Sequence, residues 1–321
     1  METRTLGSIG PVSALSLGGG GIGAVWGETT HDEAVATVRE ALGSGITLLD
    51  LAPSYGNGEA ERVVGDAFAG ALPDGVRVTT KCGLGNPAAD DVYDILSTSL
   101  TESLERMRVD HVDVFLLHSN LVSDGHGSDR GTPLTLYRDA VRPAFQRIVD
   151  EGRARAWGVS GIGWPSVVRT VLADNPGPAV VQCIANLLDS TGAIHRSDEP
   201  LAPRTSIRLA QQRGVGVMGI RAVQAGALTD GFDRELPEDH PDLEDFRRAA
   251  PFREIAAEHG VGAAHLAHRY SLSMVGVDTV VLGVKNRDEL RDCLAAEAAG
   301  PLDAESVHRI GRSVSRTEAA V

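Results

Sequence analysis

The sequence lacks several features that would place the protein in a specialised class. It has three cysteines, Cys82, Cys183 and Cys293, which lie far apart and form no C-x-x-C pair. An odd and sparse set of this kind is typical of reduced thiols rather than of a disulfide framework. No apolar run approaches the ~18 residues of a membrane span, and the amino terminus shows no apolar signal segment. A soluble, cytoplasmic protein is therefore expected.

Positive charge is also scarce. Thirty lysines and arginines stand against 44 acidic residues, which gives a formal net charge of −14. Such a balance disfavours a nucleic-acid backbone or an anionic membrane as the partner, and leaves a small-molecule partner as the expectation. No apolar seam is evident, so a monomer and a homo-oligomer both remain open. Composition is otherwise that of an ordinary globular protein, with 42% hydrophobic and 23% charged residues.

Short β-branched runs alternate with longer stretches of helical periodicity along the whole chain. Strict alternation of this kind predicts an α/β fold, with a parallel sheet closed into a (β/α)8 TIM barrel. No linker interrupts the pattern, so residues 1–321 are expected to form a single domain. The eight expected strands are Val12–Leu17, Thr47–Ala52, Val76–Lys81, Val112–His118, Ala154–Ser160, Val180–Ala185, Val215–Ile220 and Val277–Leu282.

The helices between these strands have readable ends. Thr30 and Glu33 form a capping box that opens a helix over Ala34–Leu42, and Gly43 and Gly45 lie where that helix should stop. The other expected helices are Glu59–Phe68, Asp91–Arg106, Ala140–Asp150, Pro165–Ala173, Thr205–Arg213, Pro251–Glu258, Ala263–Leu272, Arg287–Ala296 and Leu302–Glu318.

Two segments are longer than ordinary connections. Residues 119–136 follow the fourth strand and residues 221–250 follow the seventh. Both leave carboxyl ends of strands, where barrel enzymes build their active sites, so the segments are expected to shape a pocket. The alternative is that they are surface insertions without a role. The acidic stretch Glu235–Asp245 within the second segment is interpreted as a solvated charge run, and Asp239, His240 and Pro241 as a loop.

Four polar side chains follow adjacent strands at the same end of the predicted barrel. Asp50 and Tyr55 come after the second strand, Lys81 ends the third, and His118 ends the fourth. A free tyrosine titrates near ~10, and a neighbouring ammonium lowers that value by favouring the phenolate. We therefore expect Lys81, held by Asp50, to tune Tyr55 as a general acid and base. Taken singly, each residue could have a structural role instead of a catalytic one, Asp50 and Lys81 as a buried ion pair and His118 as a core histidine.

These residues carry a resemblance to a known family. The run LLDLAPSYGNGEAERVVGDAF, together with TTKCG and VDVFLLH, resembles the aldo-keto reductases, and the likeness extends over almost the whole chain. The resemblance implies a catalytic tetrad of Asp50, Tyr55, Lys81 and His118. It also implies a nicotinamide dinucleotide that donates hydride to an aldehyde or ketone, or accepts hydride from the corresponding alcohol. NADP(H) is the family's habit, and NAD(H) is a serious competitor.

The same resemblance assigns cofactor contacts. Ser160 and Gln182 are expected at the nicotinamide carboxamide, with Gly161 standing where many members have Asn. Ile220 takes the place of the usual stacking aromatic, and the neighbouring Arg221 is expected to reach a phosphate or the substrate. The expected adenosine-phosphate segment is Gly283, Lys285 and Arg287, with Glu289 where a downstream arginine is usual. Trp26, on a glycine-rich loop, is expected to line the substrate pocket or simply to pack.

Other interpretations remain to be tested. His265 and His268 have helical spacing but no evident carboxylate or cysteine partner, so no metal site is assigned. Some members of the family sense redox state for other proteins and turn over slowly. This makes a redox-sensing, NAD(P)(H)-binding regulatory protein the main alternative to an enzyme. A Schiff-base barrel using Lys81 ranks lower, because a lysine kept protonated beside an aspartate is a poor nucleophile.

Overall fold

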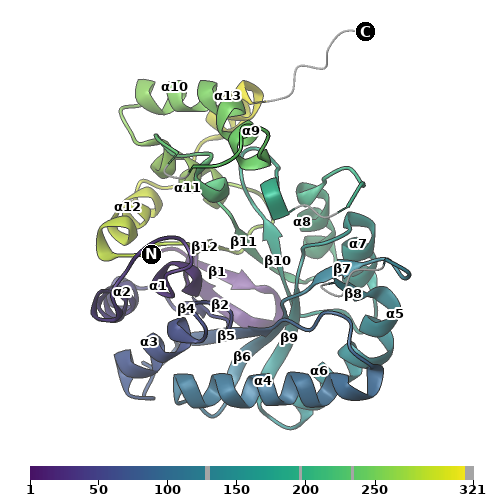
Figure 1. The fold of residues 1–321 in the computed structure, drawn as a ribbon. Coiled ribbons are helices and arrows are strands. Elements are labelled where there is room, and N and C mark those ends of the chain that lie inside the picture. The colour runs from purple at the N-terminus through teal and green to yellow at the C-terminus, as the bar shows by residue number, and fades with distance from the viewer. Residues whose placement is uncertain (127–130, 195–196, 233–234, 315–321) are drawn as a thin grey trace.

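A computed structural model describes residues 1–126, 131–194, 197–232 and 235–314. Its centre is a closed barrel of eight parallel strands in the order β10-β11-β12-β3-β4-β5-β6-β9 (Figure 1). The strands are β3 (Leu15–Gly18), β4 (Leu48–Asp50), β5 (Arg77–Cys82), β6 (Val112–Leu117), β9 (Ala154–Ser160), β10 (Val180–Ile184), β11 (Gly216–Ile220) and β12 (Thr279–Leu282). The predicted TIM barrel is confirmed, and each strand lies within or beside its expected range.

Helices surround the barrel on its outside. Thr30 caps α2 by accepting a hydrogen bond from the amide of Glu33, as the capping box predicts. The longer helices are α2 (His31–Gly43), α3 (Glu59–Phe68), α4 (Val92–Met107), α6 (Arg142–Asp150), α7 (Pro165–Ala173), α8 (Pro203–Gln212), α9 (Pro241–Arg248), α10 (Ala250–Glu258), α11 (Ala263–Leu272), α12 (Arg287–Ala298) and α13 (Ala304–Ser313). The single turns α1 (Gly19–Ile22) and α5 (Leu134–Leu136) complete the set.

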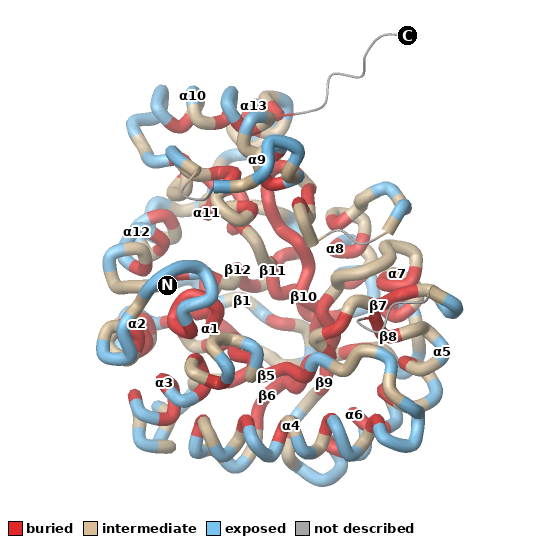
Figure 2. The backbone as a smooth tube through the Cα atoms, viewed as in Figure 1, coloured by how far each residue is buried: buried red, intermediate tan, exposed pale blue. Residues whose placement is uncertain are grey.

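Apolar side chains fill the space inside the barrel and the shell between strands and helices. Leu48, Val114, Leu116 and Met218 pack inside the barrel, while the larger cluster joins the outer faces of the strands to the helices. Figure 2 shows the strands as buried and the outer helix surfaces as exposed. A second cluster lies between α10, α11 and α13. Because the barrel interior is filled with side chains, chemistry is confined to its ends.

One feature of the amino terminus escaped sequence analysis. β1 (Thr3–Leu6) and β2 (Gly10–Ser13) form an antiparallel hairpin that covers one end of the barrel (purple in Figure 1). Leu6 packs with the interior cluster, and a Cβ on Gly7 would lie 2.6 Å from the amide nitrogen of Gly216. Gly216 begins β11, so the hairpin closes the amino end and leaves the carboxyl end as the open face.

The two long segments contain short elements of their own. The first holds β7 (Asn120–Val122) and β8 (Gly131–Pro133), which pair with each other, and then α5. The second holds α9, and the expectation that the acidic stretch Glu235–Asp245 is solvated is wrong for the two aspartates on this helix. His240 caps α9, and both Asp242 and Asp245 on that helix are buried. Sequence analysis missed this because the partners of these carboxylates include Ala193, Arg221 and Gln224, which lie in the segments after β10 and β11.

The described residues include no helix that is both long and apolar enough to cross a membrane.

Candidate active site

The structure brings together the four polar residues predicted from strand ends. Asp50 is the last residue of β4, Lys81 lies one residue before the end of β5, and His118 directly follows β6. Tyr55 lies in the turn before α3. Lys81 Nζ is 2.9 Å from Asp50 Oδ1 and 3.2 Å from Tyr55 Oη. The rings of Tyr55 and His118 meet edge to face with centroids 5.8 Å apart, so the phenol lies between a cation and an imidazole.

The ammonium group of Lys81 is buried and has three polar partners. Its side chain has no solvent exposure, and Nζ donates to the carbonyl oxygen of Leu51 at 2.7 Å as well as to Tyr55. Burial tends to lower the pKa of Lys81. The charge of Asp50 and the hydrogen bonds to Asp50 and Tyr55 outweigh burial, so the pKa is raised. The ammonium therefore stays charged, which disfavours a Schiff-base role.

Asp50 has two partners that sequence analysis did not assign to it. Its Oδ1 accepts from the hydroxyl of Thr79 at 2.8 Å and from Nε2 of Gln182 at 2.8 Å, besides its contact with Lys81. Thr79 and Lys81 are two residues apart on β5 and so face the same side of the strand. That alternation in VTTKC is the signal that could have identified Thr79. Nothing in the sequence pointed to a contact between Gln182 and Asp50.

The titration of Tyr55 differs from the expectation. Burial raises its pKa and Asp50 adds to the effect, while the charge and hydrogen bond of Lys81 lower it by less, so the net direction is upward. Tyr55 therefore remains a phenol at neutral pH and can donate its proton. Burial and the charge of Lys81 lower the pKa of His118 to about 4, against a smaller opposing effect of Asp50. His118 is thus a neutral imidazole.

The expected carboxamide contacts lie on neighbouring strands. Ser160 ends β9 and pairs in register with Gln182 on β10. The Ser160 hydroxyl is buried, and it has no hydrogen-bond partner within the described part of the chain. A buried hydroxyl without a partner is costly, and a bound carboxamide would satisfy it. Ile220 ends β11 near this point and is partly buried. These residues fit the carboxamide end of a nicotinamide dinucleotide.

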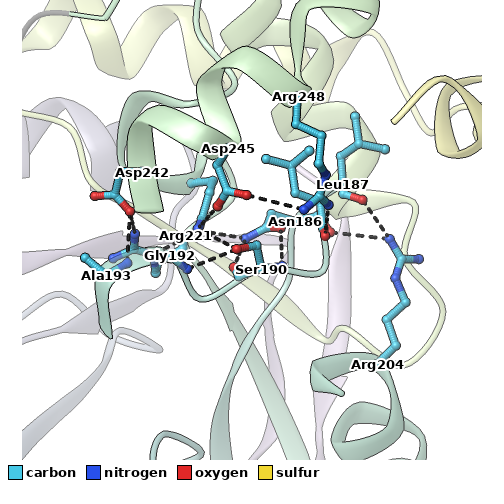
Figure 3. A network of polar contacts seen from close by, with 12 residues as sticks. Asn186, Leu187, Ser190, Gly192, Ala193, Arg204, Arg221, Asp242, Asp245 and Arg248 are labelled. Carbon is cyan, nitrogen blue, oxygen red and sulfur yellow. Dashed lines mark hydrogen bonds and ion pairs between the residues drawn. The ribbon is translucent and has the colours of Figure 1, made fainter. Parts of the chain in front are cut away.

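Arg221 is placed differently from the expectation. Its guanidinium donates to Gln224 Oε1 at 3.0 Å and lies 3.4 Å from Asp242 Oδ1 on α9 (Figure 3). Gln224 in turn donates to Asp245 at 2.8 Å and accepts from Asn186 at 3.0 Å. The arginine expected to reach a phosphate or the substrate thus belongs to a buried network that attaches α9 to the ends of β10 and β11.

The segment after β12 lies against the loop that carries Trp26. Thr29 donates to the carbonyl oxygen of Lys285 at 2.7 Å. A Cβ on Gly20 would lie 2.3 Å from Trp26 Nε1, and one on Gly283 would lie 3.6 Å from the same atom. Trp26 is 55% exposed. Its indole therefore lies at the rim between the two loops, close to Gly283 of the expected cofactor segment.

A separate hollow of about 510 Å³ lies at the other end of the barrel. Arg155, Pro178 and Gly214, at the starts of β9, β10 and β11, contribute to its lining. This is the amino end, where parallel-barrel enzymes do not place their chemistry. The polar cluster at the carboxyl end remains the candidate active site.

Comparison with known proteins gives a consistent result. The model of the aldo/keto reductase family matches residues 14–314. L-galactose dehydrogenase from Arabidopsis thaliana is 29% identical, covering 92% of this chain and 88% of its own. A probable voltage-gated potassium channel subunit beta from the same plant is 26% identical and covers 94% and 93%.

Two solved structures share the fold. A holo-form aldo-keto reductase from Bacillus halodurans superposes with a TM-score of 0.74 at 23% identity, covering 99% of both chains. An aldo-keto reductase from Klebsiella pneumoniae in complex with NADPH superposes with a TM-score of 0.68 at 25% identity, covering 97% and 95%.

Proposed function

Because this chain belongs to the aldo/keto reductase family, we propose that it interconverts an aldehyde or ketone and its alcohol with Tyr55 as general acid and base. One observation carries the proposal: Tyr55 Oη lies 3.2 Å from the ammonium of Lys81, which lies 2.9 Å from Asp50. The phenol is thereby oriented at the open end of the barrel. Lys81 and Asp50, which hold it there, are both buried and hydrogen-bonded.

In the direction of reduction, Tyr55 and His118 hydrogen-bond the carbonyl oxygen of the substrate. The imidazole is neutral because its pKa is about 4, so it can donate an N–H without adding a full charge. Tyr55 then gives its proton to the developing alkoxide, and Lys81 stabilises the phenolate left behind. Asp50 keeps Lys81 protonated and in place. A bound nicotinamide dinucleotide supplies or accepts the hydride.

Ser160, Gln182 and Ile220 are proposed to hold the nicotinamide end, and Gly283, Lys285 and Arg287 the adenosine end. Trp26 is proposed to line the rim where substrate enters. Two solved aldo-keto reductase structures from Klebsiella pneumoniae are complexes with NADPH and with NADP. By that likeness alone NADP(H) would be the cofactor, with NAD(H) as the competitor.

Tyr55→Phe tests the proposal. The variant keeps the ring and its packing and loses only the hydroxyl, so turnover should fall by about a hundredfold to ten-thousandfold. The dissociation constant of the cofactor should change little. L-galactose and a panel of small aldehydes and ketones are suitable substrates, since one relative is an L-galactose dehydrogenase. A variant that kept near-normal turnover would contradict the proposed mechanism.

A redox-sensing regulatory protein is the second candidate. It is favoured by the likeness to probable potassium channel beta subunits. The complete set of Asp50, Tyr55, Lys81 and His118 favours catalysis instead. Tight cofactor binding together with negligible turnover across the whole panel would favour the regulatory alternative.

A further inference from the structure

The charged side chains at the start of α12 are arranged in two pairs. Lys285 Nζ lies 3.1 Å from Glu289 Oε1. Arg287 donates through Nε and Nη2 to the two carboxylate oxygens of Glu33 on α2, at 3.1 and 2.9 Å. Each cation of the expected adenosine-phosphate segment is therefore matched by one carboxylate, and the four groups sum to zero charge.

The backbone donors of this helix start are engaged in the same way. The amide of Lys285 donates to Glu289 Oε2 at 2.9 Å, and the amide of Arg287 donates to Glu33 Oε1 at 3.0 Å. The amide of Glu289 donates to the side chain of Asn286 at 2.9 Å. Amides at a helix start are the groups that would otherwise bind a phosphate. Here two carboxylates and a capping side chain have taken that place.

The next cation along α12 offers no substitute. Arg291 donates to Glu40 at 2.7 Å through Nε and lies 3.1 Å from Asp288. Lys285 is also one of only two lysines in the sequence, and the other, Lys81, is buried in the active site. A phosphate monoester at this end of the barrel would therefore meet cations that already have carboxylate partners.

We propose that Glu289 and Glu33 make the adenosine end selective for NAD(H) over NADP(H). This inference rests on the proposed function. A 2′-phosphate close enough to bond Lys285 or Arg287 would lie beside Glu289 or Glu33, and like charges at that separation repel. An unphosphorylated ribose brings hydroxyl donors instead. Glu289 has lone pairs beyond those used by Lys285, and a carboxylate can accept a hydrogen bond from a ribose 2′-hydroxyl.

The test is direct binding. The full-length protein is titrated with NADH and with NADPH at one fixed ionic strength, followed by nicotinamide fluorescence and by calorimetry. We expect NADH to bind at least about tenfold more tightly. Glu289→Gln and Glu33→Gln keep the size of the side chain, while each removes one negative charge and one of the two oxygens that accept from Lys285 or Arg287. Each should raise the affinity for NADPH about tenfold and leave the affinity for NADH unchanged or lower.

Asp288→Asn is the matched control. Asp288 is 91% exposed, contacts Arg291, and lies next to Glu289 on the same helix turn. Its neutralisation changes the net charge of the protein by the same amount, and should alter the NADPH affinity by less than about twofold because solvent screens it. An equal gain in the control would overturn the specific roles of Glu289 and Glu33.

The outcomes separate the two claims. Tighter binding of NADPH than of NADH by the wild-type protein overturns the inference and leaves the proposed function intact. Binding of neither nucleotide overturns the proposed function, and the inference with it. Tighter NADH binding, with the NADPH affinity rising only in the two glutamate variants, supports the inference.

Discussion

The side-chain amide of Gln182 lies 2.8 Å from Oδ1 of Asp50 and donates to it. A carboxylate can only accept, so the NH₂ group of Gln182 must face Asp50 and its carbonyl oxygen must face elsewhere. Gln182, which the family resemblance assigns to the nicotinamide carboxamide, thus also orients the Asp50 carboxylate that holds Lys81. In the proposed complex, the Gln182 oxygen accepts from the NH₂ of the carboxamide and the Ser160 hydroxyl donates to its oxygen.

This orientation predicts how a cofactor analogue binds. An analogue with an acetyl group in place of the carboxamide keeps the carbonyl oxygen and loses the NH₂ donor. It should bind the wild-type protein about tenfold more weakly than the natural cofactor, because Gln182 is left with an unpaired oxygen. In Gln182→Leu that difference should disappear, as measured by fluorescence titration. A penalty of equal size in both proteins would mean that Gln182 does not contact the carboxamide.

Thr79 should act through Asp50 on the proton chemistry. Thr79→Val removes the 2.8 Å hydrogen bond to Oδ1, which should cost about 1.5–3 kcal/mol of stability. With less support for Asp50, the charge on Lys81 is less well held, and the pH–rate profile of kcat should move. Substrate KM should change less than kcat.

Thr80→Val is the matched control for Thr79→Val. Thr80 is the next residue of β5, is equally buried, and donates to the buried carboxylate of Glu61 at 2.6 Å. Glu61 lies on α3 and pairs with Arg106, outside the catalytic cluster. Both variants should unfold at lower urea concentrations, but only Thr79→Val should shift the pH–rate profile. A shift of the same size in both would show a general structural effect.

Arg221 should stabilise α9 rather than bind cofactor. Arg221→Gln removes the charge that pairs with Asp242, and leaves two buried carboxylates on α9 with less compensation. Amide hydrogen exchange should become faster in residues 241–248 and stay slow in the barrel strands. The dissociation constants of NADH and NADPH should change by less than about twofold, since the guanidinium points into the network. A large loss of affinity for either nucleotide would instead support a role for Arg221 at a cofactor phosphate.

The sequence predicted the parts of the fold that depend on local pattern. Strand–helix alternation identified all eight barrel strands, and Thr30 with Glu33 located the start of α2. The barrel topology places the ends of β4, β5 and β6 side by side. Because residues at the carboxyl ends of adjacent barrel strands converge, the strand order alone was enough to group Asp50, Lys81 and His118.

What the sequence did not predict depends on contacts between distant residues. The partners of Arg287 and Arg221 are Glu33 and Asp242, and no local pattern relates a residue of α12 to one of α2. The same holds for Gln182 and Asp50, which are 132 residues apart. The direction of the pKa shift of Tyr55 could not be predicted from the sequence either, because it depends on how far burial outweighs the charge of Lys81.

His118 should make the protein less stable in mild acid. Its pKa is about 4 in the fold, chiefly because it is buried, and about 6.5 in the unfolded chain. Below pH 6.5 the unfolded chain therefore binds a proton that the fold does not. The free energy of unfolding therefore begins to fall below pH 6.5 and continues to fall as the pH approaches 4, by a total of about 3 kcal/mol. Urea unfolding at pH 7 and pH 5 measures the loss.

His118→Gln isolates the contribution of this imidazole. The variant removes the titrating group, so its free energy of unfolding should fall less between pH 7 and pH 5 than that of the wild type. His268, whose pKa is also lowered by burial, contributes to both proteins and cancels in the comparison. An equal fall in both would mean that the pKa of His118 is not lowered in the folded protein.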